Sequence, residues 1–325
     1  MKIGAHQSVA GGLVESLHRC SVDTGAALQI FTKNSSTWRE PALTDEAIEA
    51  FRSQRALFSG RVMAHTSYLI NLATNKQDIL EKSKLALVEE LKRCDKLGID
   101  YAVLHPGAHL GVGEGLGVAQ VSQALDEICE MAGPLTTKIV IENTAGQGTC
   151  VGHRFEHIRD IFAGSKHRDR LGVCLDTQHT FASGYNMTDD AGYEAVWAEF
   201  DRTIGIANLV GFHLNDSKKQ LGSRVDRHEH IGEGLLGMRL FWRLANDPRF
   251  ADLPGVLETE PREGATPYKL EIELLRSLEG LSEGPAAPVI ELPPVPEEKK
   301  SAKKASKATP QETAQGSLFG NNEKN

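Results

Sequence analysis

The stretch Lys138-Ile139-Val140-Ile141-Glu142 is a short run of mostly β-branched residues that ends in a carboxylate. Similar runs recur between residues 2 and 258, separated by amphipathic segments, of which 79–97 is the clearest because its leucines mostly keep helical spacing. Eight strands that alternate with helices predict a (β/α)8 TIM barrel, with an open doubly wound sheet as the alternative. The predicted strands are 2–6, 27–31, 61–65, 101–105, 138–142, 172–176, 210–213 and 255–258.

Most of these predicted strands end in a histidine or a carboxylate. The C-terminal ends of barrel strands converge at one mouth, so we expect the side chains at these ends to lie together. Burying so many ionisable groups without a partner is costly. Imidazole and carboxylate together suit zinc and, less selectively, manganese or iron. The strand-end residues are His65, His105, Glu142, Asp176, His213 and Glu258.

Two short segments extend this candidate metal-binding set. Asp176-Thr-Gln-His179 places a second donor about one helical turn beyond a strand end, and Asp226-Arg227-His228 places two donors on alternate residues of a loop. One ion with an open coordination position uses about three protein ligands, so the enlarged set predicts two or three ions. Sites with several metal ions are typical of phosphoryl transfer. His6 is expected beside the donors, whereas His153 and His157 are expected to be surface or loop residues.

The overall composition is that of an ordinary globular protein. The 325 residues include 36 Lys+Arg and 44 Asp+Glu, a net charge of −8 that argues weakly against a nucleic-acid partner unless bound cations offset it. The sequence contains no apolar run of membrane-spanning length and no apolar signal region. The five cysteines are scattered and form no CxxC pair, which predicts free thiols in the cytoplasm. We expect a monomer that does not contact membranes.

The composition changes near residue 283. Prolines become frequent there, and five lysines follow between Lys299 and Lys307. Such a segment buries too little apolar surface to offset its ordering entropy. The sequence therefore predicts a folded domain over 1–282 and a disordered tail over 283–325.

Several longer stretches resemble the endonuclease IV family of apurinic/apyrimidinic endonucleases across essentially all of 1–282. They include GAHQSVAGGL (4–13), HTSYLINL (65–72), VIENTAGQG (140–148), GVCLDTQHTFASGY (172–185) and HLNDSKKQLGSRVDRHEHIGEG (213–234). The resemblance implies a barrel with three Zn²⁺ ions, with Mn²⁺ an alternative at one site. It implies that His65, His105 and Glu142 hold the first ion, that Glu142, Asp176, His213 and Glu258 hold the second, and that His179, Asp226 and His228 hold the third.

The resemblance also implies a reaction on double-stranded DNA. The reaction is hydrolysis of the phosphodiester 5′ to an abasic site, which leaves a 3′-hydroxyl and a 5′-deoxyribose phosphate, and blocked 3′ ends are also trimmed. Glu142 would bridge two ions and orient the nucleophile. The resemblance implies insertion of Tyr68 and Leu69 into the DNA, although this chain has Ser36 where well-known members carry an arginine wedge. The cationic residues expected to contact phosphates are Lys218, Arg224 and Arg227.

A peptide near the C-terminus, Gln315-Gly-Ser-Leu318-Phe319, resembles the motif by which bacterial proteins dock on the DNA sliding clamp.

Two other functions remain open. A single-metal sugar isomerase or epimerase of the same barrel type would use the quartet Glu142, Asp176, His213 and Glu258 without the third group. A non-catalytic DNA-damage binding protein would use the tail as its tether. One ion per chain would favour the isomerase, whereas about three would favour the nuclease.

Overall fold

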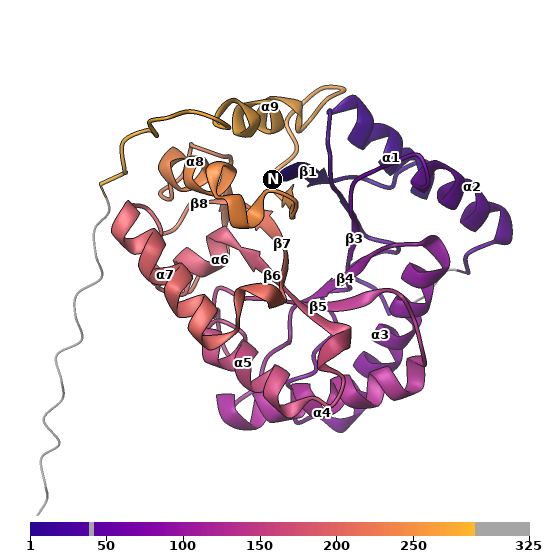
Figure 1. Ribbon diagram of the computed structural model, residues 1–325. Helices are drawn as coiled ribbons and strands as arrows, with labels where there is room; N and C mark the ends of the chain where they lie inside the picture. Colours follow the sequence, from indigo (N-terminus) through magenta and orange to yellow (C-terminus); the bar gives the residue numbers. More distant parts are fainter. Residues whose placement is uncertain (39–41, 290–325) are drawn as a thin grey trace, which may run out of the picture. The chain divides into compact units, whose positions relative to one another are not determined.

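Eight parallel strands close into one barrel in the computed structural model, which describes residues 1–38 and 42–289. Pairing of β1 with both β10 and β2 closes the sheet, so the TIM-barrel prediction is confirmed and the open sheet was wrong. Helices surround the strands (Figure 1). In spatial order the strands are β1 (Lys2–His6), β10 (Pro254–Leu257), β7 (Leu209–Leu214), β6 (Leu171–Asp176), β5 (Lys138–Glu142), β4 (Tyr101–Leu104), β3 (Val62–His65) and β2 (Leu28–Ile30).

The helices follow the strands in the order that the barrel requires. Thr44 begins α2 by accepting a hydrogen bond from the Ala47 amide, and Gly98 ends α3 in the left-handed conformation at φ 70°. Short 3₁₀ turns cover 168–170, 206–208 and 248–250. The α-helices are α1 (Leu13–Val22), α2 (Asp45–Arg55), α3 (Gln77–Leu97), α4 (Glu114–Ala132), α5 (Phe155–Gly164), α6 (Thr177–Ala182), α7 (Asp190–Thr203), α8 (Met238–Asn246) and α9 (Lys269–Ser277).

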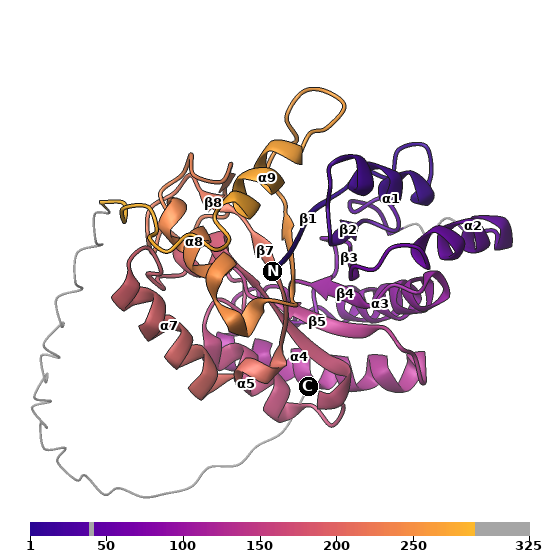
Figure 2. The same ribbon diagram turned by 45° about the horizontal axis from the view of Figure 1, so that its top comes forward.

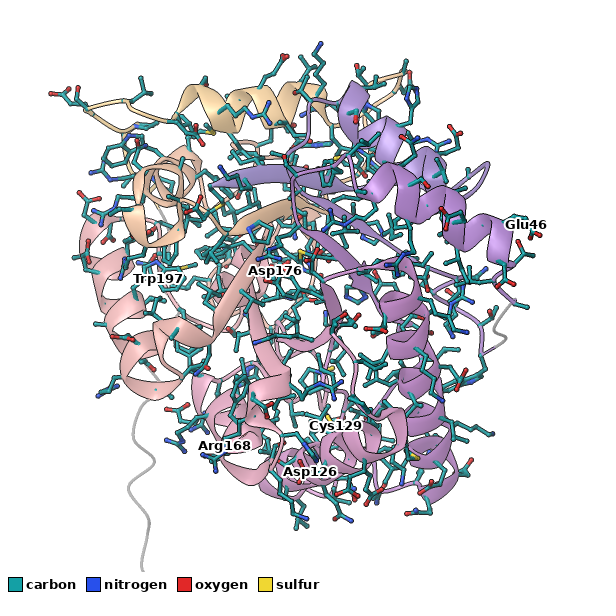
Figure 3. All side chains as sticks on the ribbon, turned by 45° about the vertical axis from the view of Figure 1, so that its right-hand side comes forward. Glu46, Asp126, Cys129, Arg168, Asp176 and Trp197 are labelled. Atoms are coloured by element: carbon teal, nitrogen blue, oxygen red, sulfur yellow. The ribbon has the colours of Figure 1, made fainter. Side chains whose placement is uncertain are left out.

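The apolar core has two parts, because alternate residues of each strand face opposite sides of the sheet. The larger part lies between the barrel and the helices, where Trp197 of α7, labelled in Figure 3, packs against Phe212 of β7 and Phe250. The smaller part fills the barrel interior, and its buried members, here called the lower layer, are Ala27, Met63, Val103, Val140, Cys174 and Val256.

One loop at the C-terminal ends of the strands contains a small hairpin of its own. The strands β8 (Asp216–Ser217) and β9 (His228–Glu229) pair antiparallel between β7 and α8. The buried carboxylate of Asp216 accepts hydrogen bonds from the amides of Ser217, Gly232, Gly234 and Leu236, at 2.7–3.2 Å. These contacts fix both ends of the loop, which carries Asp226 and His228. Figure 2 shows that the connection between β10 and α9 also projects at this end of the barrel.

The chain remains in contact with α8 beyond the predicted end of the folded domain at residue 282. Just before this point the Trp242 indole donates to the Leu281 carbonyl at 3.0 Å, and beyond it the Arg239 guanidinium donates to the Pro285 carbonyl at 2.8 Å. The expected clamp peptide at 315–319 lies outside the described residues. None of the described helices combines the length and the apolar character needed to span a bilayer.

Candidate metal centre

The polar side chains at the strand ends form one layer of the barrel interior, directly above the lower layer. Each lower-layer residue is followed two positions later by a polar residue, and residues two apart on a strand face the same way. His6 and His213 occupy the equivalent positions on the remaining two strands, two residues after Gly4 and Gly211. We call these eight residues the upper layer. It consists of His6, Gln29, His65, His105, Glu142, Asp176, His213 and Glu258.

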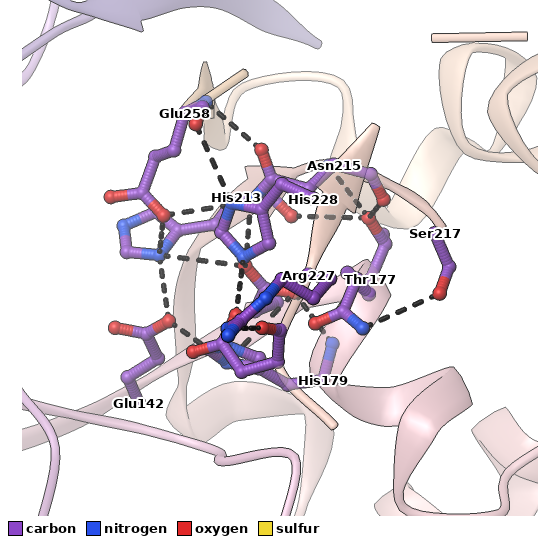
Figure 4. A network of polar contacts seen from close by, with 12 residues as sticks. Glu142, Thr177, His179, His213, Asn215, Ser217, Arg227, His228 and Glu258 are labelled. Carbon is purple, nitrogen blue, oxygen red and sulfur yellow. Dashed lines mark hydrogen bonds and ion pairs between the residues drawn. The ribbon is translucent and has the colours of Figure 1, made fainter. Parts of the chain in front are cut away.

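Glu142 lies at the centre of the upper layer and is completely buried. Its Oε2 atom is 3.2 Å from His65 Nε2 and 3.1 Å from His105 Nε2. Its Oε1 atom is 2.9 Å from His213 Nδ1 and 3.2 Å from His179 Nδ1 (Figure 4). One carboxylate therefore approaches four imidazole rings from four different elements, the arrangement expected of a bridging ligand.

The donor atoms divide into three groups, each compact enough to hold one ion. Within each group the ligand atoms lie within 4.8 Å of one another. Glu142 belongs to the first and second groups, and Asp176 belongs to the second and third. The groups are His65, His105 and Glu142; Glu142, Asp176, His213 and Glu258; and Asp176, His179 and His228.

Asp226 lies beside the third group. Its Oδ2 atom is 3.2 Å from His179 Nε2, and its Oδ1 atom is 3.3 Å from His228 Nε2. The structure thus brings all nine of the sequence-derived metal candidates into one continuous cluster, and places the carboxylate shared between the second and third groups on Asp176.

Several buried atoms of this cluster have no hydrogen-bond partner. They lie 2.9–4.0 Å from oppositely charged groups of the cluster without the geometry of a hydrogen bond, as donor atoms do when they converge on a shared cation. Leaving such atoms without a partner is costly, which makes the donor set a good fit for metal ions. The atoms are Glu142 Oε1, His179 Nε2, His213 Nδ1 and His228 Nε2.

Within the cluster, neighbouring groups of opposite charge lower the pKa of the carboxylate Glu142 and raise the pKa of the imidazole His179. Burial raises the pKa of Glu142, but His213 and His105 outweigh burial and hold this pKa well below its usual value. Burial lowers the pKa of His179, but nearby carboxylates, Asp176 first, outweigh burial and raise this pKa well above its usual value. Without an ion, protons held on the imidazoles neutralise the carboxylates. A cation would take the place of these protons.

Asp176 has a structural role besides its place among the donors. It ends β6 and caps α6, because its Oδ1 atom accepts a hydrogen bond from the His179 amide at 2.7 Å. Its Oδ2 atom accepts from the Asn215 side chain at 2.6 Å, and its amide donates to the Asn143 side chain at 2.7 Å. These bonds fix the strand-to-helix turn that delivers both Asp176 and His179.

Gln178 joins this turn to the loop between β8 and β9 that carries Asp226 and ends at His228, here called the loop of the third group. Its buried amide nitrogen donates to the Val225 carbonyl at 3.0 Å and to the Ser217 hydroxyl at 3.3 Å. The residue directly before Asp226 is thereby tied to α6.

The residues expected to contact DNA lie around the cluster. Tyr68 is 60% exposed, and its ring centroid is 5.1 Å from that of His65, whereas Leu69 is half-buried. The Tyr68 amide donates to the Ser35 carbonyl, so the loop containing Ser36 lies against the Tyr68 loop. The cationic residues, all on the loop of the third group, are Lys218, Arg224 and Arg227.

One expectation about histidines needs correction. His153 lies in the turn before α5 but is only 3% exposed, and His157, expected as a surface or loop residue, lies within α5 and is 6% exposed. Both lie against Glu114, at 3.5 Å and 3.2 Å from its carboxylate oxygens, because the turn before α5 folds back onto the start of α4. His6 lies beside the donors as expected, with its Nδ1 atom 3.1 Å from the Gln29 amide nitrogen.

Gln29 is the upper-layer residue that the strand-end argument missed. It lies inside the apolar run Leu28-Gln29-Ile30-Phe31 rather than at the end of it. Its register with the other strands, two positions after Ala27, is the signal that could have found it.

Comparison with known proteins gives a consistent result. Residues 23–278 match the family model described as "Xylose isomerase-like TIM barrel". The chain is 45% identical over 278 residues to "Probable endonuclease 4" of Chloroflexus aurantiacus, a match that covers 85% of this chain and 98% of that protein. The crystal structure of endonuclease IV from Thermus thermophilus superposes with a TM-score of 0.76 at 33% identity, covering 86% of this chain and 98% of the other.

A sugar-enzyme structure shares only the fold. A D-tagatose 3-epimerase-like protein superposes with a TM-score of 0.64 at 20% identity, covering 86% of this chain and 97% of that one. The 45% sequence identity to the Chloroflexus protein, which extends over nearly the whole length of that protein, is more than twice the identity to the epimerase-like protein. This chain belongs to the endonuclease IV family, within the xylose isomerase-like TIM barrels.

Proposed function

We propose that this protein is a DNA-repair endonuclease that hydrolyses the phosphodiester 5′ to an abasic site with the help of three zinc ions. The observation that carries the proposal is the set of three donor groups linked through Glu142 and Asp176. A single-ion isomerase needs only the quartet around His213 and has no use for His179 and His228. The endonuclease names of the relatives support the nuclease over both the isomerase and a non-catalytic binding protein.

The chemistry would divide between the ions and the protein. Bound zinc ions would supply a water of lowered pKa and positive charge next to the phosphate oxygens. Glu142, buried and close to several imidazoles, would orient the attacking water between the first two groups. His179, Asp226 and His228 would hold the third ion, next to which the departing 3′ oxygen would lie.

The protein surface around the cluster suits an abasic substrate. An abasic nucleotide lacks base stacking and pairing, so it is turned out of a duplex at low cost. The exposed Tyr68 and the half-buried Leu69 stand beside the first donor group, where they could fill the space left in the duplex. Lys218, Arg224 and Arg227 would contact phosphates. The same site would accept a blocked 3′ end, which also lacks an intact base-paired nucleotide.

Three further assignments complete the proposal. The five cysteines are free, which fits a reducing cytoplasm. The protein would act as a monomer, because all nine donors come from one chain. The peptide Gln315–Phe319 would tether the enzyme to the sliding clamp, and a synthetic tail peptide that fails to bind the clamp at about 10–100 µM would reject this tether.

The decisive experiment combines a nicking assay with metal analysis. The substrate is a 5′-labelled duplex with one tetrahydrofuran abasic analogue, and the control is the same duplex without damage. We expect incision 5′ to the analogue, a fragment with an extendable 3′-hydroxyl, and close to three zinc ions per chain. About one ion per chain with no incision would favour the isomerase. Tight binding without incision by metal-loaded protein would favour the binding protein.

A further inference from the structure

Gln29 lies in the upper layer and contacts three of its members through one amide group. The side chain is completely buried. Its Nε2 atom is 2.6 Å from Glu258 Oε1 and 3.1 Å from His6 Nδ1, and its Oε1 atom is 2.8 Å from His213 Nε2. The two amide hydrogens and the carbonyl oxygen are therefore all engaged.

These contacts fix the orientation of the amide and then the tautomer of His213. An ionised carboxylate only accepts hydrogen bonds, so the atom 2.6 Å from Glu258 must be the donating nitrogen of Gln29. The Gln29 oxygen consequently faces His213 Nε2, which must carry a proton. In the neutral ring that would bind a cation, the Nδ1 atom of His213 is then left with the lone pair.

The lone pair of His213 points into the second donor group. His213 Nδ1 is 2.9 Å from Glu142 Oε1 and 3.1 Å from Glu258 Oε2, and it has no hydrogen-bond partner. The two oxygens of Glu258 likewise have different roles. Its Oε1 atom accepts a hydrogen bond from Gln29, and its Oε2 atom faces the donor group. One amide thus prepares two ligands at once.

The other histidines of the cluster with a partner on Nδ1 are oriented by the main chain. The Nδ1 atom of His65 faces the Thr66 carbonyl at 2.8 Å, and that of His179 faces the Asn143 carbonyl at 2.9 Å. Their ligand atom is therefore Nε2. His213 presents the opposite nitrogen and depends on a side chain for it, so this ring, unlike those of His65 and His179, can lose its orientation by a single side-chain substitution.

We propose that Gln29 is a positioning residue of the metal centre, which selects the Nδ1-coordinating tautomer of His213 and orients Glu258 for the second ion. The proposal rests on the metal centre of the proposed function and not on its DNA substrate. Partners of ligand residues typically change metal affinity by about 10–100-fold when removed.

The test replaces Gln29 with an apolar side chain of similar size. Gln29→Met keeps the volume and removes all three hydrogen bonds. The matched control is Met63→Leu in the lower layer, a volume-conserving change on the neighbouring strand. The first readout is zinc retained per chain during timed dialysis against a chelator. We expect Gln29→Met to lose one ion about 10–100-fold faster than wild type, and Met63→Leu to match wild type.

A second readout follows the His213 ring itself. In protein labelled with ¹⁵N-histidine, His213 of the zinc-loaded wild type should show a protonated Nε2, and the signal is assigned by its absence in His213→Gln. Gln29→Met should weaken or remove this signature, which a merely structural role of Gln29 would leave in place. Wild-type zinc retention together with an unchanged His213 spectrum in Gln29→Met would overturn the proposal.

A second variant keeps the test decisive if Gln29→Met fails to fold. Gln29→Glu still offers an oxygen to His213 Nε2 but removes the donor to Glu258. The His213 signature should persist while the same ion is lost faster, and retention equal to wild type would refute the role of Gln29. Neither readout involves DNA, so a metal-loaded protein that fails to nick abasic DNA would reject the proposed function without affecting this result.

Discussion

The upper and lower layers of the barrel interior lie on the same strands and differ by two residues, yet their chemistry is opposite. The lower layer is apolar and completely buried. The upper layer places carboxylates and imidazoles in contact, with Glu142, Asp176 and His213 fully buried as well. Two residues of a strand span about 7 Å. The contrast teaches that residues for stability and residues for chemistry lie only two positions apart on the same strands, and that the buried charges of the upper layer suit bound cations.

Removing the metal should have the largest effect, and it should act only through the upper layer. We expect complete loss of nicking and a fall in the melting temperature, because protons on the imidazoles replace the doubly charged ions only in part as counter-charge for Glu142 and Asp176. Zinc restores both. Calorimetric scans of loaded and metal-free protein would measure the difference. Equal melting temperatures would contradict a cation requirement in this layer.

The metal effect should also depend on pH. The pKa of His179 is raised in the metal-free fold, so the proton on this ring stabilises that fold at low pH and is lost as the pH rises through the raised pKa. Metal competes with this proton. The difference in melting temperature between loaded and metal-free protein should therefore be larger at pH 8 than at pH 6. The opposite trend would mean that protons do not occupy the ligand positions.

Glu142→Gln should reduce activity by about 10²–10⁴-fold, since the amide cannot bridge two ions or orient water as a carboxylate does. Nicking rates on the abasic duplex measure the loss. Gel-shift affinity and circular dichroism should stay close to wild type, because the substitution keeps the shape of the side chain. Wild-type turnover would refute the bridging role.

Much of the difference between the upper and lower layers can be predicted from the sequence, because residues two apart on a strand face the same side of the sheet. Runs such as Ile139-Val140-Ile141 indicate buried strands, and the residue after each run was identified as a donor because barrel strands end at a common mouth. The argument depended on where the apolar run stops. It therefore missed Gln29, where the run continues past the polar residue and only pairing with neighbouring strands reveals the layer.

The placement of loops was less accessible from the sequence. Asp226 and His228 reach the cluster because Asp216 and Gln178 tie their loop to β7 and α6, contacts between residues far apart in the chain. The burial of His153 and His157 was not anticipated, because no local pattern shows that the turn before α5 packs against Glu114. The alternation of residues along a strand can be recognised within a short stretch of sequence, whereas these contacts join segments that are distant in the chain.

Met63→Ala should show the converse of Glu142→Gln. Truncating a buried methionine in the lower layer leaves a cavity, and we expect a loss of about 2–5 kcal/mol in the free energy of unfolding with kcat within about threefold of wild type. Urea unfolding of metal-loaded protein measures the first, and nicking kinetics the second. Met63→Leu, which should lose less than about 1.5 kcal/mol, is the control. A large loss of kcat in Met63→Ala would show that the layers are coupled.

Tyr68→Ala tests the rim of the upper layer and should have the smallest effect. The side chain is 60% exposed, so its removal should change stability by no more than about 0.5 kcal/mol. If its ring stacks in the duplex, a contact of about 1–3 kcal/mol, KM for abasic DNA should rise by about tenfold with little change in kcat, and Tyr68→Phe should behave as wild type.

Leu57→Ala provides the matched control for Tyr68. Leu57 is 80% exposed and lies between α2 and β3, at the opposite end of the barrel from the metal centre, so its removal should leave KM unchanged. An unchanged KM in Tyr68→Ala would mean that this ring serves only to cover His65 and Phe31, whose ring centroids lie 5.1 Å and 5.6 Å from its own. In that case the residues that bind the DNA would lie on the loop of the third group and not on the Tyr68 loop.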